Sequence, residues 1–463
     1  MKKTLVALAA LAAATGAFAQ SPNARAITGS GVEIFGVIDL TVSQHTGDKM
    51  GGQTAMSGDG RNESSRLGFR GVEDIGGGWG AGFWLEAGAF FDSGAGQNTT
   101  SNNTAAGDKV LFGSTAAVPY APSSTLSPRQ GLTFNRASVV SLLNKDFGEI
   151  RVGRDYNPSF WNYTAFDPFG TVGSGSAMLV QGGNLAVAGA QLPPGAAYPL
   201  IRTSNSVGWL SNNMNGFRAQ LQVALSEQFN GCQAAYANGF NADVSNAQTG
   251  NTCLGASGDG KLVAGRLSYA SGPLTAAAAY SKTSWSNIAH TTATATTISS
   301  LANTTNYKGD LTVVNFGAGY QLNSALRLVG SIGTQELTAT VSNPSRRLNH
   351  STIGALYTQG AMTYKISYNQ AARSDGSTDS NGTNVTSLDG SKQTQVALGA
   401  VYDLSKRTAL YGTYANQTTT AGTGSATGLT AGLSGFSGMF SQVLTANGKA
   451  TTSGVDIGIR HRF

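Results

Sequence analysis

The chain has 463 residues, of which only 12% are charged, and its mean hydropathy of -0.11 is close to neutral. This balance is unlike that of a disordered chain or of an ordinary soluble enzyme. The net charge of +6 is too small an excess to indicate a nucleic-acid partner.

The N-terminus has the three parts of a secretory signal peptide. Met1-Lys2-Lys3 is basic, an apolar run follows from Thr4 to Gly16, and Ala17-Phe18-Ala19 forms a small-x-small cleavage site before Gln20. A transmembrane helix needs about 18 or more apolar residues, and this run is shorter. We therefore expect residues 1–19 to be cleaved on export and the mature chain to span residues 20–463.

Hydrophobic residues alternate with polar ones along the whole mature chain. From Gly31 to Val42, valine, isoleucine and leucine share one face, whereas Glu33, Asp39 and Thr41 share the other. Spans with this period are Gly31 to Val42, Arg66 to Arg70, Trp79 to Glu86, Phe134 to Leu142, the strand at Glu149, Arg202 to Leu210, Gly216 to Leu225, Lys261 to Tyr269, Leu274 to Lys282, Leu311 to Gln321, Leu326 to Gln335, His350 to Tyr357, Ala361 to Asn369, Gln393 to Tyr402, Thr408 to Tyr414 and Gly454 to Phe463. The pattern predicts an all-β protein, a transmembrane antiparallel β-barrel of about 16 strands.

The connections between these spans alternate in length. Short turns such as Asn323-Ser324-Ala325 alternate with long polar stretches such as Phe91 to Thr133 and Ser226 to Gly260. Short periplasmic turns and long external loops are typical of outer-membrane barrels. A soluble β-sandwich is the alternative, but its apolar faces would have to meet each other, and the opposite faces here suit a watery lumen.

One stretch interrupts the alternation. After Gly148 to Val152 the chain continues as an aromatic, proline-containing segment to about Ile201, and ordinary strands resume directly afterwards. An insertion of this length inside a compact domain is improbable without a function. We expect it to fold into the barrel lumen as a constriction loop, at approximately 154–201.

Several motifs resemble one family. They are Arg-Leu-Gly-Phe-Arg-Gly from Arg66, Phe134-Asn135-Arg136, Gly153-Arg154-Asp155-Tyr156, Asp167-Pro168-Phe169-Gly170 and the terminal Phe463. Together they resemble the trimeric general porins of Gram-negative bacteria, in particular the arginine-rich, anion-preferring branch. Asp167-Pro168 replaces the usual Pro-Glu of the loop tip, and Thr171 stands where a second glycine is usual.

The resemblance implies a homotrimer in the outer membrane, surrounded by lipid and lipopolysaccharide. It implies passive diffusion of ions and small hydrophilic solutes, with a weak anion preference and no cofactor. Phe463 would be read by the barrel assembly machinery. A substrate-specific sugar or organic-acid channel is the alternative, because Trp161, Tyr163, Phe166 and Phe169 supply aromatic side chains. An adhesin or an enzymatic barrel is a further alternative, although no nucleophile-and-base pattern indicates a catalytic site.

The same resemblance suggests the residues of the constriction. Arg66, Arg136, Arg154 and Arg202 resemble the arginine ladder, and Asp155 and Asp167 would face it. Strict alternation would place Arg154 on the lipid side unless the strand ends first or a bulge turns it inward. The arginines could also be merely solvated in a wide lumen, and Asp167 could instead form an Asx-type turn before Pro168.

The two cysteines lie in one predicted external loop. In an exported protein, Cys232 and Cys253 are most simply a disulfide. Metal binding by the two sulfurs is the weaker hypothesis, since His45, His290, His350 and His461 show no ligand spacing.

Overall fold

The computed structural model describes residues 29–48, 50–97, 129–177, 201–225, 260–289, 306–338, 345–378, 382, 389–422, 429–431, 442–444 and 448–463. The proposed signal peptide, most of the long polar connections and both cysteines lie outside these residues. No helix among the described residues is long and apolar enough to cross a membrane.

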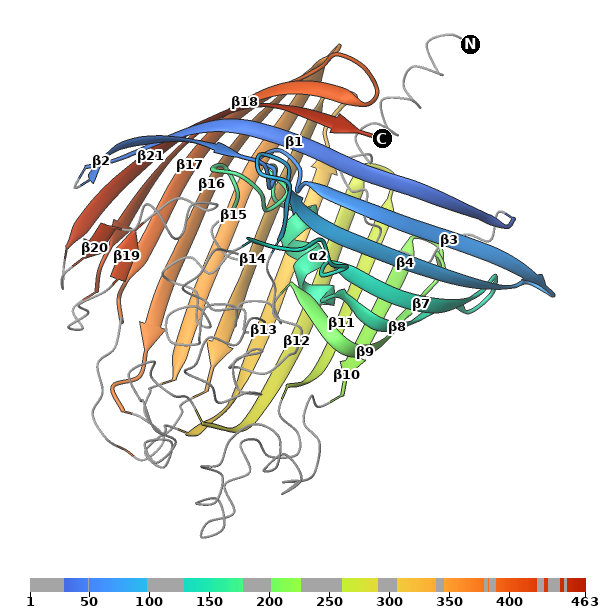
Figure 1. Ribbon diagram of the computed structural model, residues 1–463. Coiled ribbons are helices and arrows are strands. Elements are labelled where there is room, and N and C mark those ends of the chain that lie inside the picture. The colour runs from blue at the N-terminus through green and yellow to red at the C-terminus, as the bar shows by residue number, and fades with distance from the viewer. Residues whose placement is uncertain are drawn as a thin grey trace, which may run out of the picture.

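In the described part of the chain, a closed 16-strand antiparallel β-barrel accounts for nearly all regular structure (Figure 1). The predicted fold class is therefore confirmed. Its strands are β1 (Gly31–Gly47), β3 (Arg66–Gly76), β4 (Trp79–Phe90), β7 (Ala137–Asn144), β8 (Gly148–Tyr156), β9 (Arg202–Leu210), β10 (Phe217–Ala224), β11 (Lys261–Ser271), β12 (Leu274–Ala289), β13 (Asn306–Gln321), β14 (Leu326–Leu337), β15 (Arg346–Gln359), β16 (Met362–Asp375), β17 (Lys392–Asp403), β18 (Thr408–Thr420) and β21 (Lys449–Arg462). Each strand pairs with the next in this order, and β21 closes the ring against β1.

The alternation in the sequence corresponds to the two faces of the barrel wall. On β21, Ile457 is 64% exposed on the outside, whereas the neighbouring Asp456 is fully buried on the lumen side. On β1, Val42 is exposed and Ser43 is buried in the same way. Apolar side chains face outward and polar ones inward, as a membrane barrel requires.

Several strands are longer than the spans in which hydrophobic and polar residues alternate. β18 runs to Thr420, beyond the alternating span from Thr408 to Tyr414, and β21 begins at Lys449, before the span from Gly454 to Phe463. Beyond the membrane both faces of a strand meet water, so its hydrophobic alternation disappears while the hydrogen-bonded ladder continues. Threonine-rich segments such as Thr418 to Thr420 also favour extended backbone.

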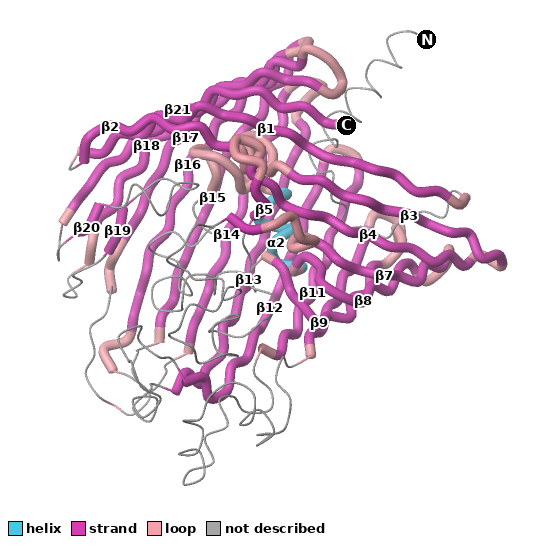
Figure 2. The backbone as a smooth tube through the Cα atoms, in the orientation of Figure 1, coloured by secondary structure: helices cyan, strands magenta, loops and turns pink. Residues whose placement is uncertain are grey.

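The remaining elements are short. β2 (Met50–Ser57) pairs with the second half of β1. β5 (Ala95–Gln97) pairs with both β4 and β6 (Arg129–Gln130), and β19 (Leu429–Ala431) pairs with β20 (Gln442–Leu444). The helix α2 (Pro158–Ala165) lies inside the ring of strands (Figure 2).

The last residue is held against the first strand. The backbone N–H of Phe463 donates to the carbonyl of Gly36 (3.2 Å), and the N–H of Gly36 donates to the carbonyl of Phe463 (3.1 Å). The Phe463 ring occupies the space above Gly36, where an added Cβ would come within 2.3 Å of it. The terminal aromatic residue therefore packs at the seam where β21 meets β1.

Candidate functional site

The segment after β8 folds into the barrel and runs along its inner wall. It starts with α2, whose N-cap Asn157 accepts a hydrogen bond from the N–H of Ser159 (2.9 Å), with Pro158 in the first turn. The hydroxyl of Ser159 lies 3.0 Å from that of Ser281 on β12. Arg266 of β11 donates to the side-chain oxygen of Asn162 (2.6 Å). The helix is thus bonded to the wall on the far side of the lumen from β3 and β4.

Beyond the helix, the segment continues around the wall. Tyr163 contacts His350 of β15 at 3.2 Å, and Gln395 of β17 donates to the carbonyls of Ser174 (3.1 Å) and Ser176 (3.0 Å). The N–H of Ser174 donates to Asp456 of β21 (2.8 Å). The described residues 157–177 therefore fold into the barrel and follow its wall from β11 to β21, as an in-folded loop does. Residues 154–156 of the predicted loop belong instead to β8, and residues 178–200 lie outside the described part of the chain.

Glycines in the strands make room for this loop. An added Cβ at Gly317 would lie 2.0 Å from the Phe166 ring, one at Gly354 would lie 2.4 Å from Pro168, and one at Gly399 would lie 2.8 Å from Phe169. Phe166 and Phe169 are only 2% and 4% exposed. The loop aromatics are therefore used to fasten the loop to the wall, and they do not form an open track along the lumen.

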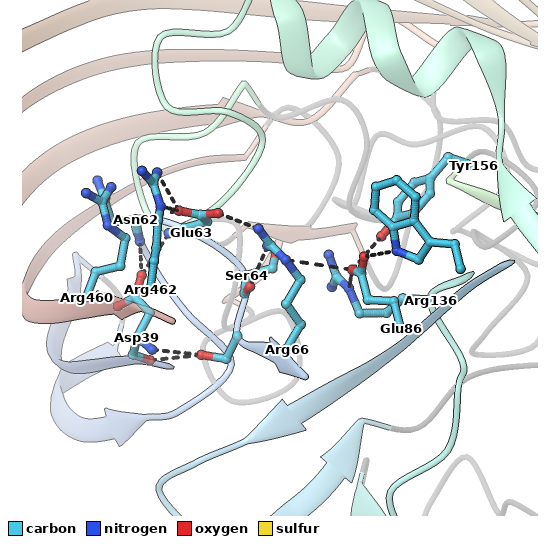
Figure 3. A network of polar contacts seen from close by, with 12 residues as sticks. Asp39, Asn62, Glu63, Ser64, Arg66, Glu86, Arg136, Tyr156, Arg460 and Arg462 are labelled. Atoms are coloured by element: carbon cyan, nitrogen blue, oxygen red, sulfur yellow. Dashed lines mark hydrogen bonds and ion pairs between the residues drawn. The ribbon is translucent and has the colours of Figure 1, made fainter. Parts of the chain in front are cut away.

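Three of the four predicted arginines meet around one carboxylate. Glu86 on β4 accepts a hydrogen bond from Arg136 (2.5 Å) and lies 3.9 Å from Arg66 (Figure 3). The hydroxyl of Tyr156 donates to Glu86 (3.3 Å), and Arg202 in turn donates to that hydroxyl (3.4 Å). The arginines are thus linked through Glu86 and Tyr156, although they lie far apart in the sequence. Burial would lower the pKa of Arg136, but Tyr156 and Glu86 outweigh burial and raise it, so the guanidinium stays charged.

A second in-folded turn, residues 57–65, completes this basic cluster, and sequence reasoning missed it. The carboxylate of Asp39 on β1 accepts the N–H groups of Asn62 (2.8 Å) and Glu63 (2.7 Å). Glu63 pairs with Arg66 and with Arg462 of β21 (2.7 Å) (Figure 3). An acidic residue in the middle of the lumen face of β1, followed by the Gly58-Asp59-Gly60 turn sequence, was the available signal.

The charges around Glu63 also fix its ionisation. Burial alone would raise the pKa of this carboxyl. The guanidinium groups of Arg66, Arg462 and Arg460 outweigh burial and hold the pKa below its ordinary value of 4.5. Glu63 is therefore a carboxylate at neutral pH and joins β3, β21 and the turn.

Arg154 does not join the cluster. In the β7–β8 register it faces Ser138, on the same side as Val152 and its partner Val140, both of which are exposed. The bulge that the sequence suggested is present between β8 and β9, but the extra residue belongs to β9, where Asn205 has a φ of 50°. The Arg154 guanidinium donates to the carbonyl of Asn135 (2.7 Å) and to the hydroxyl of Ser204 (2.5 Å).

The two loop acids lie apart from each other and from the cluster. Asp155 pairs with Arg151 on the same strand at 3.2 Å. Asp167 accepts backbone N–H groups from Phe169 (2.9 Å), Thr171 (3.0 Å) and Ala177 (2.8 Å), which is an Asx-type turn extended by two further bonds. Asp167 therefore holds the loop in shape, whereas Asp155 is bonded within β8.

Other predicted sites have no structural description. Cys232 and Cys253 lie outside the described residues, so their disulfide stays a prediction. Among the described residues, no group of histidine, cysteine or acidic side chains is arranged to hold a metal ion.

Comparison with known proteins identifies this architecture. The Gram-negative porin family matches residues 6–422. The chain belongs to this family. It is therefore an outer-membrane channel for passive diffusion, and its family and fold are those of a channel rather than of an enzyme.

Individual porins resemble this one over its full length. Outer membrane porin protein 32 of Delftia acidovorans is 29% identical over 463 residues. The alignment covers 100% of both chains. The solved anion-selective porin from Comamonas acidovorans is 25% identical, with a TM-score of 0.64 over 94% of this porin and 100% of that chain. OmpT of Vibrio cholerae in its trimer form shares the fold at 12% identity, with a TM-score of 0.51 over 94% of this porin and 100% of that chain.

Proposed function

We propose that this porin is a general diffusion channel for ions and small hydrophilic solutes, that it weakly prefers anions, and that it assembles as a homotrimer. The observation that carries the anion preference is the charge balance of the basic cluster. The cluster consists of five guanidinium groups and four carboxylates, those of Arg66, Arg136, Arg202, Arg460 and Arg462, and of Asp39, Glu63, Glu86 and Asp403.

The surplus of one positive charge lies opposite the in-folded loop. The loop acids cannot cancel it, because Asp155 is paired with Arg151 and Asp167 is bonded to the loop backbone. Selection then follows from the width and the charge of the constriction, without energy input. Arg66, Arg136 and Arg202 are the proposed selectivity residues. Arg154 is left out because it lies on the outward side of β8 with Val152.

A general channel fits the lumen better than a sugar-specific one. Recognition of a sugar ring needs aromatic faces along the path. Here Phe166 and Phe169 pack onto barrel glycines, and Trp161 and Tyr163 are buried. The trimer is supported by the general porins whose motifs this chain resembles. It is also consistent with the trimer form of OmpT, which shares this fold.

Planar-bilayer recording of the purified protein tests the proposal. A single insertion should give an ohmic current that rises linearly with salt concentration and closes in three equal steps, one for each barrel. A protein that inserts without conductance would contradict the channel, and closure in a single step would contradict the homotrimer.

A further inference from the structure

Three arginines on the opposite wall differ from those of the basic cluster. Arg218 on β10, Arg266 on β11 and Arg327 on β14 alternate with exposed outward residues such as Leu221, so their side chains are on the lumen side. Over the described residues, no carboxylate forms a salt bridge with any of the three. By contrast, Arg66, Arg136, Arg151 and Arg462 each pair with an acid.

Two of these arginines are close neighbours. In the β10–β11 register Arg218 faces Ser268, and Arg266 lies two residues away on the same face. Such diagonal neighbours are about 7–8 Å apart, within reach of long side chains. The positive charge of Arg218 acts on Arg266 without an intervening acid. Like charges placed this way repel each other, so an anion between them would remove an unfavourable interaction.

The hydrogen bonds of these side chains leave donors available. Arg266 uses its Nε to donate to Asn162, and the described contacts assign no acceptor to the two terminal nitrogens of its guanidinium. Arg218 is half-buried, and no described side chain accepts from it. A guanidinium offers five N–H donors in a planar fork that fits carboxylate and phosphate oxygens. The unused N–H donors of Arg218 and Arg266 are therefore suited to bind the oxygen atoms of an oxyanion.

The pair has a defined place along the channel. Arg218 follows the first residue of β10, next to the short turn that joins β9 to β10, and Arg266 is bonded to α2 above it. Arg327, one residue inside β14, reaches across β13 to donate to Thr275 of β12 (3.4 Å) at the same end. Short turns mark the periplasmic end of an outer-membrane barrel. The site therefore lies between the in-folded loop and the periplasmic mouth.

We propose that Arg218 and Arg266 form a binding subsite for small oxyanions on the periplasmic side of the constriction. Arg327, nearer the rim, adds positive potential on the path to it. The proposal rests on the proposed function, because it requires a conducting lumen, and it adds a second site that discriminates among anions by shape. The basic cluster, whose arginines are already bonded to carboxylates, acts mainly through its net charge.

Inorganic phosphate is the probe. Chloride current through single trimers of known orientation should be blocked by phosphate, and a lower phosphate concentration should suffice on the periplasmic side than on the external side. In Arg218→Gln/Arg266→Gln the half-blocking concentration should rise about tenfold, which corresponds to about 1.4 kcal/mol. Arg218→Lys/Arg266→Lys keeps both charges but loses the planar fork, so it should keep the chloride conductance and lose most of the phosphate block.

Lys406→Gln/Arg407→Gln is the matched control. It removes two charges from the exposed turn at the same end of the barrel and should leave the block unchanged. An unchanged half-blocking concentration in Arg218→Gln/Arg266→Gln would overturn the site, as would an equal shift in the control. The reversal potential of the same channels in potassium chloride tests the proposed anion preference separately. If the reversal potential shows no anion preference, the phosphate block still decides whether the subsite exists.

Discussion

At the scale of single residues, Glu86 limits the charge of the constriction. It accepts hydrogen bonds from Arg136 and Tyr156 and lies near Arg66, so it offsets part of the positive charge there. Removing one negative charge about 7 Å from a permeating anion is worth about 0.6 kcal/mol at the permittivity of water. We expect Glu86→Gln to raise the anion-to-cation permeability ratio about threefold at low salt, as measured from reversal potentials.

Glu336→Gln is the control for this change. Glu336 is a half-exposed acid on β14 that pairs with Arg347 outside the cluster, so its neutralisation should not move the reversal potential. A fall in the permeability ratio of Glu86→Gln, or an equal change in the control, would contradict the role given to Glu86.

Protonation of Glu63 is expected to change the conductance of the constriction at low pH. Its pKa is below the ordinary value of 4.5 in the folded protein, so the carboxylate stabilises the turn at residues 57–65 above that pH. This stabilisation is lost as the pH falls through the lowered pKa. We expect wild-type channels to become noisier and to change conductance as the pH falls below 4.5. Glu63→Gln should show the acid behaviour already at pH ~7. Identical pH profiles for the two proteins would contradict this assignment.

Three of the five cluster arginines were expected at the constriction from the sequence, but Arg460, Arg462 and the carboxylate partners were not. Arg66, Arg136 and Arg202 were singled out by their motifs. Glu63 and Asp39 pair with residues that come close only after β21 closes against β1. For Arg154, alternation alone was the better guide, because the extra residue of the bulge lies on β9.

At the scale of elements, the loop is held by the fit of its aromatics against strand glycines. Gly317→Leu would place a side chain where the Phe166 ring now lies, since even a Cβ would approach to 2.0 Å. We expect this variant to displace the loop and to raise single-channel conductance and noise. Gly412→Leu is the control, because a Cβ there meets its nearest atom at 3.9 Å. Equal conductance in both variants would show that the loop does not depend on this contact.

The contact between Phe463 and Gly36 is expected to serve assembly of the barrel. Phe463 covers Gly36 on the outside of the barrel, away from the lumen. We expect Phe463→Ala, or deletion of the residue, to reduce the amount of folded barrel in the outer membrane, measured by its heat-modifiable migration in gels. Phe463→Tyr should restore the yield, and the molecules that do fold should conduct normally. A normal yield for Phe463→Ala would contradict the prediction.

Strands could be predicted from their period and the in-folded loop from the break in that period, whereas the shape of the elements inside the barrel could not. Residues such as Val455 and Asp456 alternate because one face of the barrel wall contacts lipid and the other contacts water. α2 and the turn at residues 57–65 contact only the interior wall and the lumen, so neither surface imposes a period on them. Their shape depends on caps and buried carboxylates, such as Asn157 and Asp39.

At the scale of the whole molecule, the closed ring leaves no free strand edge in the described barrel and isolates a polar interior from lipid. The in-folded loop lines most of that interior and leaves the basic cluster facing it. Function is therefore a property of the assembled ring, because the residues of the cluster come from β1, β3, β4, β9 and β21.

The reversal potential in a potassium chloride gradient tests this account most directly. The one surplus positive charge of the cluster, about 7 Å from an anion, supplies about 0.6 kcal/mol without screening. A Debye length of about 8 Å at physiological ionic strength reduces this to about 0.25 kcal/mol, and at about 1 M little remains. We predict a weak anion preference that is largest at low salt, vanishes at high salt and falls in Arg136→Gln/Arg202→Gln. A cation preference in the wild type, or a preference unaffected by salt and by these substitutions, would contradict the account.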